Sequence, residues 1–192
     1  TFEGCTFVNN TANRDGGALF VDADSVSISS CDFYDNTTTG NGQGGAASIK
    51  TNGYKIPTVI SNSVFIDNES SSNGGAIAVE NNAGPNSEVL IRGSAFMQCN
   101  ADDDGGAIYV SVYSDKIRVV LSDFIDNYAN YGGAVYGGVN VETSIFEDNS
   151  AHRDGGGIHG FSRGTVTQSE FINCYARDDG GGTYAVSAIS LT

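Results

Sequence analysis

The chain has no tryptophan, only two prolines, four cysteines and nine basic residues among its 192. Four cysteines are too few for a disulfide-built scaffold, and the scarcity of proline argues against a low-complexity linker. Nine Lys and Arg against 23 Asp and Glu give a formal net charge of −14. A chain this acidic lacks the basic surface that nucleic acids and anionic membranes require. No apolar run approaches the roughly 20 residues of a spanning helix, so we expect no nucleic-acid partner and no membrane insertion by this segment.

Glycine is abundant instead, with 26 residues, and much of it falls in pairs that repeat along the chain. A phenylalanine precedes each pair by 8 to 11 residues. The seven pairs begin at Gly16, Gly44, Gly74, Gly105, Gly132, Gly155 and Gly180. The phenylalanines are Phe7, Phe33, Phe65, Phe96, Phe124, Phe146 and Phe171. Self-similarity of this kind predicts a repeat architecture.

Each repeat also carries a polar position and short runs of alternating apolar residues. Three residues after Phe comes asparagine in five repeats, and Cys99 or Cys174 in the other two. The five are Asn10, Asn36, Asn68, Asn127 and Asn149. Runs such as residues 18–21 and 107–110 alternate with period two, which indicates half-buried strands.

These features predict an all-β fold, a single parallel β-helix of about seven coils over residues 1–192. A helical solenoid would need apolar residues at spacings of three and four, and a glycine pair in every unit would break such helices. We expect two or three short strands per coil, with the Phe and Asn residues stacked in structural columns. No capping helix is apparent, so we expect both ends to be uncapped and the chain to be a segment of a longer array.

The pairing of Gly-Gly-Ala-(Ile/Leu/Val) with Phe-x-x-Asn resembles the polymorphic outer membrane protein repeat, known best from chlamydial surface adhesins. The clearest matches are residues 74–77 with 65–68 and residues 132–135 with 124–127. Gly157 and Gly182 depart from the pattern, since they replace its alanine. The resemblance implies a right-handed β-helix at a cell surface, often with an adhesive role. Right-handedness also agrees with the rule for parallel crossovers.

One column on the strand after the glycines carries candidate binding residues. If Ile108, Val135 and Ile158 point inward, the next residue in each repeat points outward. That column is Phe20, Ser48, Ala78, Tyr109, Tyr136, His159 and Tyr184. The last four would form a strip suited to a sugar or a protein partner; a packed internal column is the alternative. Insertions fall beyond this strand, where the interval from the first glycine of each pair to the next column Phe varies from 14 to 22 residues. These insertions either form a binding edge or are length variation tolerated in solvent-exposed loops.

Acidic residues suggest a calcium site. Asp154 and Asp179 each precede a glycine pair in adjacent coils, and stacked carboxylates suit Ca²⁺. Solvated acidic turns are the alternative, because no calcium-binding motif is present. We expect no other cofactor.

Cysteines and sequons offer two further hypotheses. Cys5 and Cys31 share a column in adjacent coils, so their spacing permits a disulfide, although direct stacking disfavours its dihedral angle. Sequons begin at Asn9, Asn36 and Asn68, but the last two belong to the Asn column, where an internal amide could not carry a glycan. Chance in an Asn- and Ser-rich chain is the alternative.

The pattern favours a non-enzymatic module, extracellular or on the cell surface, that serves as an adhesin stalk or a structural segment of a fibre. Its expected partners are other copies or neighbouring segments end to end, and a host-surface protein or glycan. The alternative is a polysaccharide-acting enzyme similar to pectate lyase or polygalacturonase. Its candidate groups would be Asp178 and Asp179 with His159, Arg153 and Arg177. None forms a catalytic motif, and the repeat pattern is unbroken around them.

Overall fold

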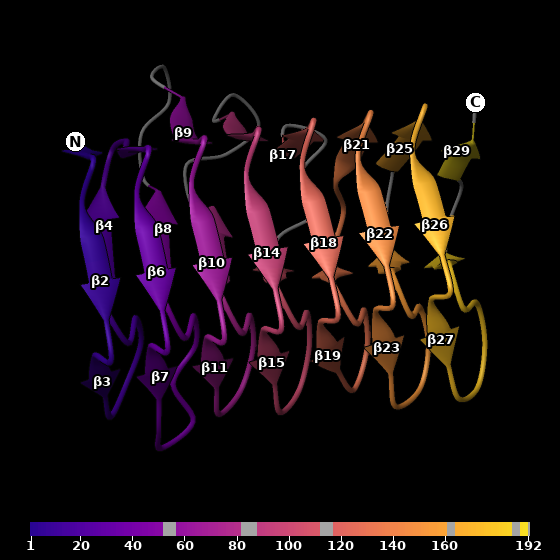
Figure 1. The fold of residues 1–192 in the computed structure, drawn as a ribbon, viewed down its shortest axis with the longest axis horizontal. Helices are drawn as coiled ribbons and strands as arrows, with labels where there is room; N and C mark the ends of the chain where they lie inside the picture. The colour runs from indigo at the N-terminus through magenta and orange to yellow at the C-terminus, as the bar shows by residue number, and fades with distance from the viewer. Residues whose placement is uncertain (52–56, 82–87, 112–116, 161–163, 186–188, 192) are drawn as a thin grey trace.

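The protein is a right-handed parallel β-helix, as the sequence predicted (Figure 1). The computed structural model describes residues 1–51, 57–81, 88–111, 117–160, 164–185 and 189–191. Within these ranges there is no helix, and so none long and apolar enough to cross a membrane. Each coil contributes one strand to each of four parallel sheets, which we call A, B, C and D in chain order. The sequence had suggested only two or three strands per coil.

Sheets A and B form the upper and front faces in Figure 1. Sheet A consists of β1 (Phe2–Glu3), β5 (Ser27–Ser29), β9 (Thr58–Ser61), β13 (Val89–Arg92), β17 (Ile117–Val120), β21 (Asn140–Glu142), β25 (Gly164–Thr167) and β29 (Ile189–Leu191). Sheet B consists of β2 (Thr6–Val8), β6 (Asp32–Tyr34), β10 (Val64–Ile66), β14 (Ala95–Met97), β18 (Asp123–Ile125), β22 (Ile145–Glu147) and β26 (Glu170–Ile172).

Sheets C and D complete each coil. Sheet C consists of β3 (Thr11–Ala12), β7 (Thr37–Thr38), β11 (Glu69–Ser70), β15 (Asn100–Ala101), β19 (Tyr128–Ala129), β23 (Ser150–Ala151) and β27 (Tyr175–Ala176). Sheet D consists of β4 (Leu19–Ala23), β8 (Ala47–Thr51), β12 (Ile77–Asn81), β16 (Ile108–Val110), β20 (Val135–Tyr136), β24 (Ile158–Gly160) and β28 (Thr183–Ala185). Sheet C was missed from the sequence because a two-residue strand shows no alternation.

Left-handed backbone at the corners turns the chain from sheet to sheet. The corner between sheets A and B has positive φ in every coil, even where Leu121 (φ 52°) or Thr143 (φ 49°) occupies it. The corner between sheets B and C also has positive φ throughout, and Asn or Asp, which tolerate this region best among non-glycine residues, fill six of its seven positions. Those residues are Asn9, Asp35, Asp67, Gln98, Asp126, Asp148 and Asn173.

The second glycine of each pair is required by close packing between coils. A Cβ atom at Gly75 would collide with the carbonyl oxygen of Gly106 in the next coil and with the backbone of Asn100. Five of the other second glycines have the same constraint from the next coil, whereas a Cβ atom at Gly181 would meet the carbonyl oxygen of Cys174 in its own coil. The glycine pair therefore sets how closely sheets C and D approach at their corner.

The phenylalanines stack along the middle of the helix. Sheet B pairs each Phe with the Phe of the next coil in register. Successive ring centroids lie 4.6–4.9 Å apart with interplanar angles of 4–9°. The five middle rings are fully buried, and Phe7 and Phe171 in the outer coils are partly buried. This stack is the centre of the hydrophobic core.

The asparagines stack beside it and satisfy backbone groups at the corner between sheets B and C. The Asn127 amide nitrogen donates to the Phe96 carbonyl at 3.0 Å and to Asn149 Oδ1 at 2.9 Å. Its Oδ1 accepts the backbone N–H of Cys99 at 3.0 Å. Asn36 makes equivalent contacts with Phe7 and Asn68. The column continues across neighbouring coils, except where a cysteine replaces asparagine.

Candidate functional site: the outer ring ladder of sheet D

Four aromatic or imidazole rings stack on the outer side of sheet D, at the positions singled out from the sequence. Strands β16, β20, β24 and β28 pair Tyr109, Tyr136, His159 and Tyr184 in register. Their successive ring centroids lie 5.6, 5.0 and 4.9 Å apart, with interplanar angles of 13°, 15° and 28°. We call these four residues the outer ring ladder.

The outer ring ladder is only partly exposed. Ile108, Val135 and Ile158 alternate with it and lie in the core, so the four rings lie on the opposite side of the sheet. The three tyrosines are half-buried, and His159 is 7% exposed. Earlier in the same column, the small buried residues Ser48 and Ala78 separate exposed Phe20 from Tyr109. The ladder therefore begins at Tyr109.

Stacking limits the chemistry that this ladder can offer. Tyr136 lies between Tyr109 and His159, and His159 lies between Tyr136 and Tyr184. Both faces of each middle ring are therefore occupied by a neighbouring ring. Stacking of a sugar on a middle ring face, one use considered from the sequence, does not fit this arrangement.

Two acidic groups set the electrostatics of the ladder. Burial and the neighbouring Asp103 raise the pKa of Asp104 to about 6, and a hydrogen bond with the Tyr136 side chain opposes the shift. Burial lowers the pKa of His159, although the charge of Asp154 acts in the opposite direction. The pKa of Tyr109 is raised by burial and by the charge of Asp104. At neutral pH the ladder thus presents neutral rings beside acidic groups.

Of the two candidate calcium ligands, Asp154 accepts a backbone hydrogen bond from the other. The Asp179 N–H donates to Asp154 Oδ1 at 3.1 Å. Asp15 accepts the N–H of Gln43 in the same way, also at 3.1 Å. Among the described residues, no three His, Cys, Asp or Glu side chains are grouped closely enough to hold a metal. The position before the glycine pair therefore has an inter-coil structural role in these coils.

The residues considered for polysaccharide chemistry lie in different surroundings. His159 lies in the outer ring ladder, whereas Asp178 and Asp179 are exposed in the turn after β27. Arg177 Nη1 lies 3.3 Å from His152 Nε2. The Arg153 guanidinium lies 5.6 Å from the centroid of the Tyr131 ring. These contacts do not direct the candidate groups toward a common point.

The predicted cysteine pair is not bridged. Cys5 and Cys31 are free thiols, and each lies near the carbonyl oxygen two residues before it, at 3.5 and 3.2 Å. The Cys5 N–H also donates to the Cys31 sulfur at 3.4 Å. The disulfide expected as one option is therefore absent, because both sulfurs turn toward the backbone.

Only one of the three sequons is accessible. Asn36 and Asn68 are completely buried in the Asn column, where their amides make inter-coil hydrogen bonds. A glycan on either residue would break the column. Asn9 is exposed at the corner between sheets B and C, so the glycosylation hypothesis survives at that position alone.

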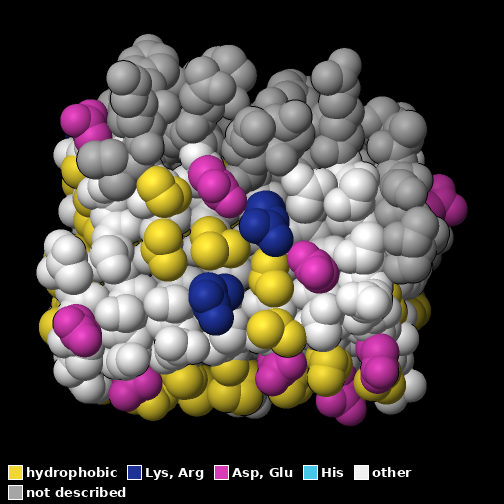
Figure 2. All heavy atoms as spheres, turned by 90° about the horizontal axis from the view of Figure 1, so that it is seen from above, with side chains coloured by type: hydrophobic (Ala, Val, Ile, Leu, Met, Phe, Trp, Pro, Cys, Tyr) yellow, Lys and Arg dark blue, Asp and Glu magenta, His cyan; other side chains and the backbone are white. Residues whose placement is uncertain are grey.

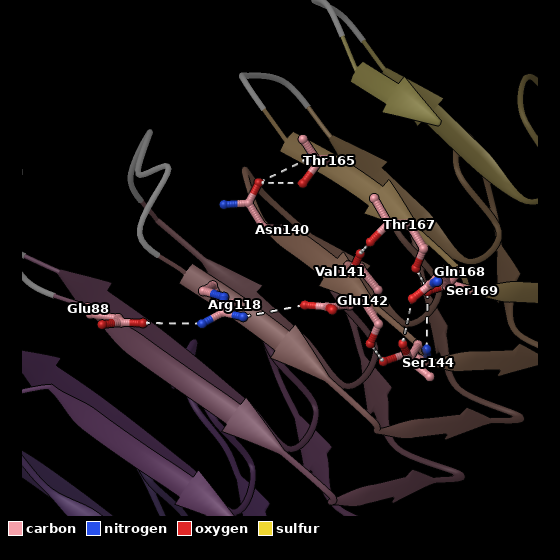
Figure 3. A network of polar contacts seen from close by, with 11 residues as sticks. Glu88, Arg118, Asn140, Val141, Glu142, Ser144, Thr165, Thr167, Gln168 and Ser169 are labelled. Atoms are coloured by element: carbon pink, nitrogen blue, oxygen red, sulfur yellow. Dashed lines mark hydrogen bonds and ion pairs between the residues drawn. The ribbon is translucent and has the colours of Figure 1, made fainter. Parts of the chain in front are cut away.

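The outer face of sheet A carries a small polar network (Figure 3). Arg118 lies between Glu88 and Glu142, at 3.8 and 3.4 Å. Beside this ion pair, Asn140 Oδ1 accepts the backbone N–H of Thr165 at 3.1 Å and its hydroxyl at 2.9 Å. Figure 2 looks onto this face, where hydrophobic side chains surround basic ones. The predicted insertions at 52–56, 82–87 and 112–116 lie outside the described residues.

Sequence reasoning missed a row of apolar side chains on the outer face of sheet B. The residue after each column Phe points outward, and six of the seven are apolar or aromatic. This sheet B row consists of Val8, Tyr34, Ile66, Met97, Ile125, Glu147 and Ile172. Figure 2 shows this face edge-on along its lower border, where yellow and magenta side chains alternate. Counting apolar residues one position after Phe would have shown the repetition, but not the face of the sheet on which the row lies.

Comparison with known families is consistent with this architecture. The model of the Chlamydia polymorphic membrane protein repeat matches residues 4–22, 62–80 and 143–160. Each matched segment contains the Phe, Asn and Gly-Gly positions of one coil. No curated protein and no solved structure matches the chain significantly.

Proposed function

We propose that this chain, three of whose coils are repeats of the Chlamydia polymorphic membrane protein type, is a non-enzymatic β-helical module at the cell surface. Its role is that of an adhesive stalk, which holds its outer faces toward a host-surface protein or glycan. The family match supports the surface assignment, since it relates the coils to those of membrane-associated proteins.

The continuity of the interior carries this proposal. The Phe stack passes through all seven coils with nearly constant geometry. The described coils therefore form an evenly packed rod whose interior holds the Phe stack. A rod of this kind suits the display of repeated outer side chains better than the enclosure of a substrate.

Adhesion can be tested with beads that carry the purified chain. We expect these beads to be retained on cultured host cells under flow more strongly than beads that carry an unrelated acidic protein. Tyr109→Ser/Tyr136→Ser tests the outer ring ladder, and Val59→Thr/Leu90→Thr on sheet A is the matched control. Equal retention of chain-coated and control beads would refute the adhesive role.

Assembly into a fibre is the other form of the structural role. In such a fibre, strand edges of one copy would pair with those of the next. Light scattering after size-exclusion chromatography and negative-stain electron microscopy would reveal filaments. A monomer at all concentrations tested would favour the stalk over the fibre.

The enzymatic alternative is tested directly with polyuronides. Incubation should yield neither new reducing ends nor unsaturated products, because the contacts of His159, Arg153 and Arg177 do not bring them together with Asp178 and Asp179. Appearance of either product, and its loss in Asp178→Asn/Asp179→Asn, would replace the proposed function with catalysis.

A further inference from the structure

The outer face of sheet B combines apolar and acidic side chains without a basic one. Val8 and Ile172 in the sheet B row are 46% and 36% exposed, and Ile145 beside the row is 39% exposed. The strand positions before the Phe column and the corner after it supply most of the acids. The acids on this face and its corner are Asp32, Asp35, Asp67, Asp123, Asp126, Glu147, Asp148 and Glu170. No Lys or Arg occupies an outward position of this sheet or of that corner.

These acids are distinct from those that the protein neutralises itself. Among the described residues, the ion pairs join Lys50 to Asp15 and Glu80, and Arg118 to Glu88 and Glu142. All four pairs lie away from sheet B. A depression of about 310 Å³ opens where the later coils pass from sheet A to sheet B. Leu121, Asp123, Ile145 and Glu170 contribute to its lining, so apolar and acidic groups meet there as well.

From this pattern we infer that the outer face of sheet B is a docking surface for a cationic amphipathic helix of a partner protein. The apolar side of such a helix would cover the sheet B row, and its Lys or Arg residues would face the acidic border. A second copy of this chain is disfavoured, because it would place acidic borders opposite each other.

The spacing of the row favours a helix over an extended strand. Successive coils place their row residues about 4.8 Å apart. One helical turn advances about 5.4 Å, whereas alternate residues of a strand are about 6.8 Å apart. Six steps between seven coils span roughly 29 Å, the length of a helix of about 19 residues. A partner strand could not add to this face, because neighbouring coils already use the backbone hydrogen bonds of sheet B.

The inference rests on the proposed role as a binding rod, but it is tested without cells. The probe is a fluorescent 20-residue Leu/Lys peptide with an amphipathic helical pattern. A scrambled Leu/Lys peptide controls for charge, and a Leu/Glu peptide of the same pattern controls for helicity. Fluorescence anisotropy with the purified chain should show saturable binding of the amphipathic Leu/Lys peptide only.

Three variants locate the binding surface. Ile66→Thr/Ile125→Thr should weaken binding about tenfold or more. Asp67→Asn/Asp126→Asn should weaken it several-fold and reduce its salt dependence, and Asn9 and Asn173 already occupy that column. Val59→Thr/Leu90→Thr on sheet A should bind as the unchanged chain does. Circular dichroism of each variant separates loss of binding from loss of fold.

Several results would overturn the inference. Equal binding of the scrambled peptide would indicate general attraction to an acidic rod. Unchanged affinity in both sheet B variants would place the binding elsewhere. A dimer that dissociates in Ile66→Thr/Ile125→Thr would assign the face to self-association. Any of these outcomes leaves the bead-adhesion test of the proposed function unaffected.

Discussion

The protein contains two stacks of rings with contrasting properties. The inner Phe stack has one residue type in all seven coils, interplanar angles below 10° and complete burial in the middle. The outer ring ladder mixes Tyr and His over four coils, with spacings up to 5.6 Å and angles up to 28°. Burial on all sides requires one ring shape inside, whereas the outer face, where three of the four rings are only partly buried, tolerates different rings. The inner stack therefore builds the rod, and the outer ladder is free to take part in function.

The sharpest test of this contrast is removal of one ring from each stack. Phe96→Ala should lower the free energy of unfolding by about 3–5 kcal/mol, because the buried ring leaves a cavity. Tyr136→Ala should cost only about 1–2 kcal/mol, since its site is half-exposed and can admit water. Urea denaturation followed by circular dichroism measures both. Equal losses would show that the two stacks contribute alike to stability.

The Asn column beside the inner Phe stack should show the next largest loss of stability on substitution. Asn127→Ala removes the partner of the Cys99 N–H and of the Phe96 carbonyl, both in a buried environment. We expect a loss of about 2–3 kcal/mol from these unsatisfied groups. Asn140→Ala, at a partly exposed position, is the control and should cost less than about 1 kcal/mol. A similar urea midpoint for both variants would contradict the role assigned to the column.

The outer ladder should respond to pH through Asp104. Its pKa is raised from 3.8 to about 6, so the folded state binds the proton more tightly than the unfolded state. The stability that protonated Asp104 contributes is therefore lost as the pH rises from 3.8 through about 6. Asp104→Asn should be more stable than the unchanged chain at pH 7 by about 1 kcal/mol, after allowance for partial solvation.

That difference should disappear below about pH 4. Urea midpoints of both proteins at pH 7, 5 and 4 provide the measurement. The lowered pKa of His159 makes folding less favourable as pH falls below 6.5, but His159 is present in both proteins and cancels in the comparison. A constant difference at all pH values would show that Asp104 does not titrate in this range.

The smallest effect on stability is expected from placing asparagine where a cysteine interrupts the Asn column. Cys99 stands where neighbouring coils have Asn, and its thiol is a weak acceptor for the Asn68 groups beside it. Cys99→Asn should raise the free energy of unfolding by about 0.5–1 kcal/mol, because the amide oxygen accepts these hydrogen bonds better. Thermal melting detects the shift. Destabilisation would show that the larger amide does not fit the site.

The inner columns were predictable because their chemistry repeats in nearly every coil. Each of these residue types has one structural role that can be recognised from the sequence. Phe is buried, Asn forms hydrogen bonds at a corner, and the glycine pair avoids a Cβ atom. The alternation around Ile108 and Val135 likewise identified the outer ring positions. Which groups those rings contact could not be predicted, since the relevant distances depend on how the coils stack.

Other features required the three-dimensional arrangement. Cys5 and Cys31 are neighbours as expected, but the direction of their sulfurs follows from local backbone contacts. The sheet B row was overlooked because Ile66 and Ile125 stand next to core phenylalanines and resemble core residues themselves. Only the alternation within each three-residue strand shows that they lie on the outer face.

The glycine pairs have a consequence for how such a protein can change in length. Because six of the seven second glycines fit against the backbone of the next coil, the rod tolerates gain or loss of a whole coil better than a change of length within one coil. Each added coil brings one more inner ring, one more outer residue on every sheet and one more acidic corner position. The reach of the rod and the number of its contact residues therefore increase together, in equal steps.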